Sequence, residues 1–413
     1  MYPAVLVTQP RLARQLLEYR WRRLEAARDY AAAQGWAGAR FPWESARTGG
    51  ETCPDWAAET KDFQHHITGD VSFAVRQYLA VTGDTELFHD TEAGVTGCEF
   101  VRLMAEFWAS RVTCGEDTMQ CDIRRVMGPD EYHAKVDNNV FTNVVAAMAV
   151  YFADFSACVA ECPGIPDEWL ERVSRLSLQY DPELDYHPQY QGYEPGTQIK
   201  QADTVLVGYP LMYNMSSVTR ENDLKMYEAV TDPGGPAMTW GMYAIGYLEL
   251  GQEDRAADLF RRSYQPYYHP PFYMWTENVN GTGAVNFITG MGGFLQGVMF
   301  GYFGLRVKLD KMEFSPVLPQ DTSTMSLTGV DYYKAVFDVS VTQDSIAVNF
   351  TKVDPAQFLI LEGKDNVVEI GNPQEVRLPK KAFEIRPLYV DFLKDALFLV
   401  TSSELRIPPD TLL

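Results

Sequence analysis

The hydrophobic pattern of this 413-residue chain changes once, near residue 305, and that change limits the fold more than any other feature. Up to that point, apolar residues recur at the three- and four-residue spacing of helices that bury one face. Beyond it, apolar and polar residues alternate with a period of two between turn residues, as at 337–341 and 345–350. We therefore expect a mainly α-helical domain over residues 1–305 and a small all-β domain over residues 306–413.

The helical part contains paired helices joined by tight turns. Gly83 and Gly251 each lie between two helical stretches with acidic residues beside them, which is typical of helical hairpins. The expected helices cover 11–33, 71–81, 97–112, 140–161, 238–250 and 253–264. Most of the unusual polar and aromatic residues lie in the long connections, at 39–62, 113–137, 180–211 and 264–284. Because long loops often carry binding and catalytic groups, we expect these connections to share one active-site face.

Charge and cysteine content exclude several classes of protein. The net charge of -21 argues against nucleic-acid binding, which needs a basic surface, and against docking on anionic membranes. No apolar run reaches the length that we expect of a transmembrane helix. The six cysteines lack the spacing of metal ligands, so we expect free thiols in a reducing, cytoplasmic compartment. His65 and His66 have no set of partners that resembles a metal site, and the chain has no phosphate-cradling Gly-x-x-x-x-Gly-Lys loop, so we also expect no metal and no cofactor.

The loop around Glu131 is the most informative polar segment. Gly128 and Pro129 break any helix before it, and Asp137 is placed to cap the helix expected at 140–161. Neighbouring side chains supply hydrogen bonds and a stacking face of the kind that a sugar needs: Tyr132, His133, Asn138 and Asn139. A polar turn without a function is the alternative interpretation of this stretch.

Three other loop segments carry residues suited to a sugar. Trp43 offers an apolar plane and Glu44 accepts hydroxyl hydrogen bonds, although a packed Trp beside a surface Glu is the alternative. Lys200 and Gln201 are donors, and a helix N-terminus explains them equally well. Glu277 follows a tryptophan and precedes a glycine-rich stretch.

Two loop carboxyl groups among aromatic residues fit glycoside cleavage. One carboxylic acid protonates the leaving oxygen, and the other, as a carboxylate, deprotonates water or attacks the anomeric carbon. Glu131 and Glu277 are the candidates for these two roles. Any large protein has many carboxylates, so the spacing alone is weak evidence.

Taken together, these segments resemble glycoside hydrolase family 65, which includes disaccharide phosphorylases and acid trehalases. The matching motifs are Gly-Ala-Arg-Phe-Pro-Trp-Glu-Ser-Ala at 38–46, Gly-Pro-Asp-Glu-Tyr-His at 128–133, Asp-Asn-Asn-x-Phe-Thr-Asn at 137–143 and Lys-Gln-Ala-Asp at 200–203. The resemblance covers about residues 40–306. It implies an (α/α)6 barrel followed by a C-terminal β-sandwich, with the first barrel helix expected to lie before Met1.

The resemblance also implies roles for the candidate residues. Glu131 corresponds to the family's general acid, in a mechanism that inverts the anomeric centre. The residues implied to line the glucose site are Trp43, Glu44, Lys200 and Gln201. The segment that carries Glu277 resembles the branch acting on collagen glucosides, in which this glutamate is the general base. Phosphorylases bind phosphate there instead, and an anionic side chain would repel it.

We therefore expect an inverting α-glucosidase whose substrate is a terminal glucose on an α-glucoside. The resemblance favours the glucosyl-α-1,2-galactosyl-hydroxylysine unit of collagen-like proteins. A phosphate-dependent disaccharide phosphorylase of the same family is the first alternative. Family members carry an Asp-containing segment before the position of Met1, so a catalytically impaired sugar-binding remnant is the second.

Overall fold

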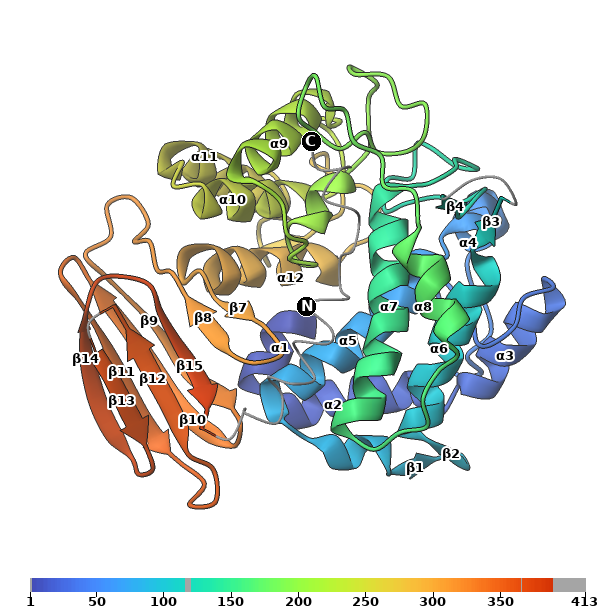
Figure 1. Ribbon diagram of the computed structural model, residues 1–413. Helices are drawn as coiled ribbons and strands as arrows, with labels where there is room; N and C mark the ends of the chain where they lie inside the picture. The colour runs from blue at the N-terminus through green and yellow to red at the C-terminus, as the bar shows by residue number, and fades with distance from the viewer. Residues whose placement is uncertain (1, 116–119, 365, 389–413) are drawn as a thin grey trace. The chain divides into compact units, whose positions relative to one another are not determined.

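The computed structural model describes residues 2–115, 120–364 and 366–388 and divides into two compact units. Among the described residues, the helical unit contains those of 15–76 and 84–232, and the sandwich unit contains those of 2–14, 77–83 and 233–388. The chain is mostly helical, with antiparallel β-sheets near its C-terminal end (Figure 1).

Helices α6 and α7 form the centre of the helical unit and lie side by side (Figure 1). The helices that lie wholly or mostly in this unit are α2 (Pro10–Trp21), α3 (Leu24–Ala33), α4 (Ala58–Phe63), α5 (His66–Thr82), α6 (Gly97–Arg111), α7 (Val140–Val159), α8 (Asp167–Ser174) and α9 (Ser217–Val230). Short two-residue strands pair as β1 (Thr91–Glu92) with β2 (Val95–Thr96) and β3 (Thr113–Cys114) with β4 (Cys121–Asp122).

Two details of the helix prediction are wrong. The single helix expected at 11–33 is divided into α2 and α3, because Arg23 adopts φ -110° and ψ 12°, outside the helical region. Asp137 does not cap α7. Asn139 immediately precedes the helix, and its side chain accepts a hydrogen bond from Thr142 N at 2.8 Å, as the N-cap position requires.

Helix α7 also corrects the statement about apolar runs. Its length and mean hydropathy are sufficient to cross a membrane, but 78% of its most apolar window is buried inside the protein. One end contributes Val140, Phe141, Val144 and Val145 to an apolar cluster that Val207 and Leu211 complete. Burial on this scale is typical of a core helix.

Four of the six cysteines form disulfides, so the expectation of six free thiols is wrong. Cys98, the second residue of α6, pairs with Cys162, which follows the end of α7. The two helices pack together, and these two ends meet although the cysteines are 64 positions apart in the sequence. Cys114 and Cys121 are cross-strand partners in the β3–β4 hairpin. Cys158, one turn before Cys162, stays free and exposed.

The sandwich unit combines helices with two antiparallel sheets. Its helices are α1 (Tyr2–Thr8), α10 (Thr239–Glu249), α11 (Glu253–Tyr264) and α12 (Ile288–Gln296), and the hairpin β5 (Tyr268–His269) and β6 (Met274–Trp275) precedes α12. Gly251, at φ +70°, makes the turn between α10 and α11, so the predicted hairpin there is confirmed.

The two sheets of this unit follow from the period-two pattern. One has the order β14-β11-β10-β9 and the other β13-β12-β15-β8-β7 (orange and red in Figure 1). The strands are β7 (Arg306–Val307), β8 (Met312–Phe314), β9 (Thr324–Tyr332), β10 (Ala335–Thr342), β11 (Ser345–Lys352), β12 (Leu359–Gly363), β13 (Asn366–Ile370), β14 (Gln374–Pro379) and β15 (Phe383–Pro387). Alternate residues of β10 are buried, and Phe337 of β10 contacts Phe314 of β8 at 6.2 Å between ring centroids, which joins the sheets.

Candidate active site

Glu131 lies in a short loop of the helical unit that two backbone hydrogen bonds close. Val126 N donates to Val136 O at 2.8 Å, and Val136 N donates to Val126 O at 2.9 Å. Near the start of the loop, a Cβ atom on Gly128 would lie only 2.2 Å from Asp203 Oδ2. Residue 128 must therefore be a glycine for packing reasons, because a side chain at this position would displace a buried carboxylate.

The side chain of Glu131 contacts the predicted Lys-Gln segment. Its Oε2 accepts a hydrogen bond from Lys200 Nζ, and both side chains remain partly exposed, at 23% and 26%. Gln201 Nε2 donates to Pro129 O at 2.5 Å. Gln201 Oε1 is buried and has no hydrogen-bond partner within the described part of the chain. The loop therefore presents an accessible carboxyl group, an ammonium group and an unsatisfied acceptor close together.

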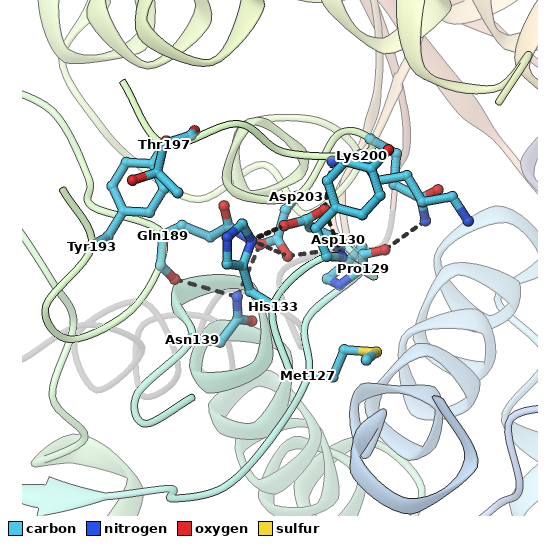
Figure 2. Close-up of polar contacts among 12 residues, drawn as sticks. Met127, Pro129, Asp130, His133, Asn139, Gln189, Tyr193, Thr197, Lys200 and Asp203 are labelled. Atoms are coloured by element: carbon cyan, nitrogen blue, oxygen red, sulfur yellow. Dashed lines mark hydrogen bonds and ion pairs between the residues drawn. The ribbon is translucent and has the colours of Figure 1, made fainter. Parts of the chain in front are cut away.

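Two fully buried aspartates, Asp130 and Asp203, connect the Glu131 loop to the segment that carries Lys200 (Figure 2). Asp203 Oδ2 accepts from Asp130 N at 3.0 Å, and Asp130 Oδ1 accepts from Lys200 N at 2.7 Å. Gln189 Nε2 donates to both carboxylates, at 3.1 Å and 3.2 Å. His133 Nδ1 lies 2.6 Å from Asp130 Oδ2. A polar network thus fixes the backbone around Glu131.

Burial controls the ionisation of Asp203. The pKa of its carboxyl group is raised to about 7, mainly by loss of solvation and also by the neighbouring Asp130 charge. The hydrogen bonds from Asp130 N and Asn139 act in the opposite direction, as does the nearby His66 ring. A carboxyl group that titrates near neutrality therefore lies inside the wall of the candidate site.

Tyr132 follows Glu131 and stays accessible, with 49% of its surface exposed. Its hydroxyl donates to Asp232 Oδ2 at 2.6 Å, and this hydrogen bond, with partial burial, raises the pKa of the phenol to about 12. The tyrosine ring is thus held as a neutral, half-exposed face of the kind that stacks on a sugar.

Asn138 and Asn139 hydrogen-bond inside the protein, whereas the sequence-based interpretation gave them to a sugar. Both are buried, and their amide groups donate to Asp122 and Asp203, at 2.8 Å and 3.0 Å. They hold the loop in place. This role was hidden in the sequence, because an asparagine that binds a sugar and one that bridges two loops look the same there.

Trp43 and Glu44 belong to the same unit and are organised by Glu51. The Glu51 carboxylate accepts from Trp43 N at 2.8 Å and from Glu44 N at 3.1 Å. It also accepts from Thr52 N and Cys53 N, at 3.0 Å and 2.9 Å. This arrangement leaves the Trp43 ring half-buried and the Glu44 side chain exposed, as ligand-binding groups need to be.

Glu277 lies in the sandwich unit, in a turn after strand β6. Its backbone N donates to Ala284 O at 2.9 Å, and its Oε2 accepts from Ala284 N at 2.9 Å. A Cβ atom on Gly283 would lie 2.7 Å from that same Oε2. Gly283 also has φ +78°, where side chains are strained. The glycine-rich stretch therefore holds the Glu277 carboxylate in one position.

A cavity of about 560 Å³ lies elsewhere in the sandwich unit, with Glu249, Arg306 and Glu384 in its lining. None of the six predicted site residues lines it, so it is not part of the candidate site.

The structure brings Glu131, Lys200 and Gln201 together, whereas Trp43 and Glu44 form a separately organised loop of the same unit. The supporting residues have no predicted role in the sequence analysis: Glu51, Asp130, Gln189 and Asp203. Asp130 and Asp203 were visible in the Gly-Pro-Asp-Glu and Lys-Gln-Ala-Asp motifs. Their burial and mutual contact depend on the tertiary fold.

Comparison with known proteins gives a consistent result. Residues 1–194 match the model of the glycosyl hydrolase family 65 central catalytic domain. The protein-glucosylgalactosylhydroxylysine glucosidase of Danio rerio is 45% identical over 363 residues, which are 88% of this chain and 54% of the relative. The corresponding Gallus gallus protein is 42% identical over 384 residues, which are 92% of this chain and 54% of the relative. The chain thus spans about half the length of these curated relatives.

A solved structure shares the fold. It is described as a kojibiose phosphorylase from the human microbiome and matches with a TM-score of 0.74 over 91% of this chain and 58% of that chain. The sequences are 19% identical, so the likeness concerns the fold alone.

Proposed function

Because the chain belongs to glycosyl hydrolase family 65, we propose that it is an inverting α-glucosidase that removes terminal glucose from α-glucosides. The observation that carries the proposal is the Glu131 loop, in which an accessible carboxyl group contacts Lys200 beside the unsatisfied Gln201 acceptor. The named activity of the Danio rerio and Gallus gallus relatives supports a glucosylgalactosyl-hydroxylysine substrate, as found on collagen-like proteins.

The proposed mechanism uses two carboxyl groups. Glu131 protonates the glycosidic oxygen as the bond to the anomeric carbon breaks. Glu277, as a carboxylate, removes a proton from the water that attacks the opposite face. Water supplies the new hydroxyl group, the aglycone leaves with the Glu131 proton, and the anomeric centre inverts. The hydrogen bond from Ala284 N and the close approach of Gly283 hold the Glu277 carboxylate in position to accept the proton from water.

Four residues are proposed to hold the glucose: Trp43, Glu44, Lys200 and Gln201. Trp43 supplies an apolar plane and Glu44 an exposed carboxylate. Gln201 Oε1 accepts a sugar hydroxyl, which satisfies an acceptor that is otherwise buried and unpaired in the described part of the chain. Lys200 Nζ moves between Glu131 and the sugar hydroxyls.

The architectural proposal is that residues 1–305 belong to an (α/α)6-barrel catalytic domain and residues 306–413 to a C-terminal β-sandwich domain. The helical pairs and the two antiparallel sheets support it. Residues 389–413 of the second domain lie outside the described residues.

The experiment is an assay of the chain with a glucosylgalactosyl-hydroxylysine peptide, with and without inorganic phosphate. The proposal predicts release of free glucose at a rate that phosphate does not change. Glucose 1-phosphate would show a phosphorylase instead. Binding of the glycopeptide without any product would show a sugar-binding protein that lacks turnover.

A further inference from the structure

Asp130 and Asp203 exchange hydrogen bonds between two chain segments that are distant in sequence. The Asp203 side chain accepts from the backbone of the Glu131 loop, at Asp130 N. The Asp130 side chain accepts from the backbone of the other segment, at Lys200 N. Gln189 bridges the two carboxylates (Figure 2). Each aspartate therefore holds the other's segment, and the pair sets the distance between Glu131 and Lys200.

The backbone is fixed on both sides of Glu131. Asp130 N, which precedes it, donates to Asp203, and Tyr132 N, which follows it, donates to Asp130 Oδ1 at 3.3 Å. Tyr132 is further held through its hydroxyl group by Asp232. The Glu131 side chain is thus carried on a backbone whose neighbouring N–H groups are both held by buried carboxylates.

Stability alone does not account for this arrangement. Two fully buried carboxyl groups in one network lose solvation and repel each other when both are ionised. Amide side chains of the same shape would avoid that repulsion. A carboxylate, however, accepts several hydrogen bonds at once, as Asp203 does from Asp130 N, Asn139 and Gln189.

We propose that Asp203, acting through Asp130, is a positioning residue that holds Glu131 where it can protonate the glycosidic oxygen. This inference rests on the proposed function, because it assumes that Glu131 is the general acid. Asp203 does not touch the substrate. Its effect is to keep the Glu131 carboxyl group in line with the leaving oxygen, where small displacements lower the rate strongly.

The dependence of turnover on the leaving group distinguishes this positioning role from a merely structural one. Kojibiose releases a sugar whose oxygen needs a proton, whereas α-glucosyl fluoride releases fluoride, which needs little acid assistance. A variant with a misplaced acid therefore loses turnover of kojibiose and keeps that of the fluoride. A variant that only folds less well loses both equally.

The experiment measures kcat of Asp203→Asn with both substrates. We expect a loss of about tenfold to a hundredfold for kojibiose and less than about threefold for α-glucosyl fluoride. Gly128→Ala places a Cβ atom that would overlap Asp203 Oδ2 and so displaces the same carboxylate. It should lower kcat for kojibiose and spare kcat for α-glucosyl fluoride, as Asp203→Asn does. Equal losses for the two substrates in both variants would overturn the proposal.

Asp223→Asn is the matched control. Asp223 is also fully buried, and its carboxylate accepts from His187 N at 2.7 Å and lies 2.8 Å from His187 Nδ1, whereas that of Asp203 accepts from Asp130 N. It should change both rates by one common factor. Glu131→Gln separates a failure of the proposed function from a failure of the positioning role of Asp203. If it lacks the selective loss, the proposed function fails. If it shows the loss and Asp203→Asn does not, only the positioning role fails.

Discussion

Glu131 and Asp203 lie in one polar network but in opposite environments. Glu131 is partly exposed and contacts the Lys200 ammonium group, whereas Asp203 has no exposed surface and accepts hydrogen bonds from Asp130 N, Asn139 and Gln189. The accessible carboxyl group is suited to exchange a proton with a ligand. The buried one is suited to hold the backbone, because its oxygens are already occupied.

At this scale the first prediction concerns Glu131→Gln. The amide keeps the size of the side chain but cannot donate a proton to the glycosidic oxygen. Turnover of an α-linked disaccharide should fall by about 10²–10⁴-fold, and glucose binding should change little. Steady-state kinetics and calorimetric titration with glucose measure the two effects. Unchanged turnover would remove Glu131 from the mechanism.

A second prediction follows from the raised pKa of Asp203, about 7 against an ordinary value of 3.8. Between these two pKa values, the folded state keeps the proton that the unfolded state releases. The contribution of Asp203 to the free energy of unfolding is therefore complete below about pH 4 and is lost as the pH rises to about 7. The free energy of unfolding of the unchanged chain should therefore fall relative to that of Asp203→Asn across this window. Asp130 and His66 face the same carboxyl group, so Asp130→Asn should reduce the effect. Denaturant unfolding at several pH values measures it, and a difference that does not vary with pH would contradict the assignment.

Among the elements, α6 and α7 are joined at one end by the disulfide between Cys98 and Cys162, which are 64 positions apart in the sequence. Loss of this crosslink relaxes the unfolded chain, so Cys98→Ser should lower the free energy of unfolding by about 2–5 kcal/mol. Cys158→Ser is the control, because Cys158 is free and exposed one helical turn away. Equal stability of the two variants in thermal unfolding would show that the bridge does not form.

The Glu277 turn gives another comparison within one element. Gly283 and Gly281 both have positive φ, at +78° and +79°, but only a Cβ on Gly283 would approach the Glu277 carboxylate. Gly283→Ala should therefore lower turnover at least about tenfold more than Gly281→Ala, although both substitutions strain the backbone. Equal activities would mean that the position of Glu277 does not matter to the reaction.

The elements also show what could be predicted from the sequence. Periodicity predicted the existence and type of the long helices and of β10 to β12, because local patterns determine which face is buried. It missed the break at Arg23 and the cap at Asn139, which depend on backbone angles of single residues. The disulfides and the Asp130–Asp203 contact join segments distant in sequence, so no local pattern contains them.

For the whole molecule, the sequence motifs predicted the family and the candidate acid. They contained no information on the cellular compartment. The cytoplasmic location stays a prediction, and its argument from free thiols no longer holds, because disulfides persist mainly in oxidising compartments. The acidic surface and the exposed Glu131 remain compatible with a neutral glycan substrate.

The most direct test of the inverting mechanism uses NMR to identify which anomer of glucose is released first. The chain acts on an α-glucoside in the absence of phosphate. An inverting mechanism with Glu131 as the acid predicts β-glucose as the initial product and its loss in Glu131→Gln. Initial α-glucose, or product that forms only when phosphate is added, would contradict it.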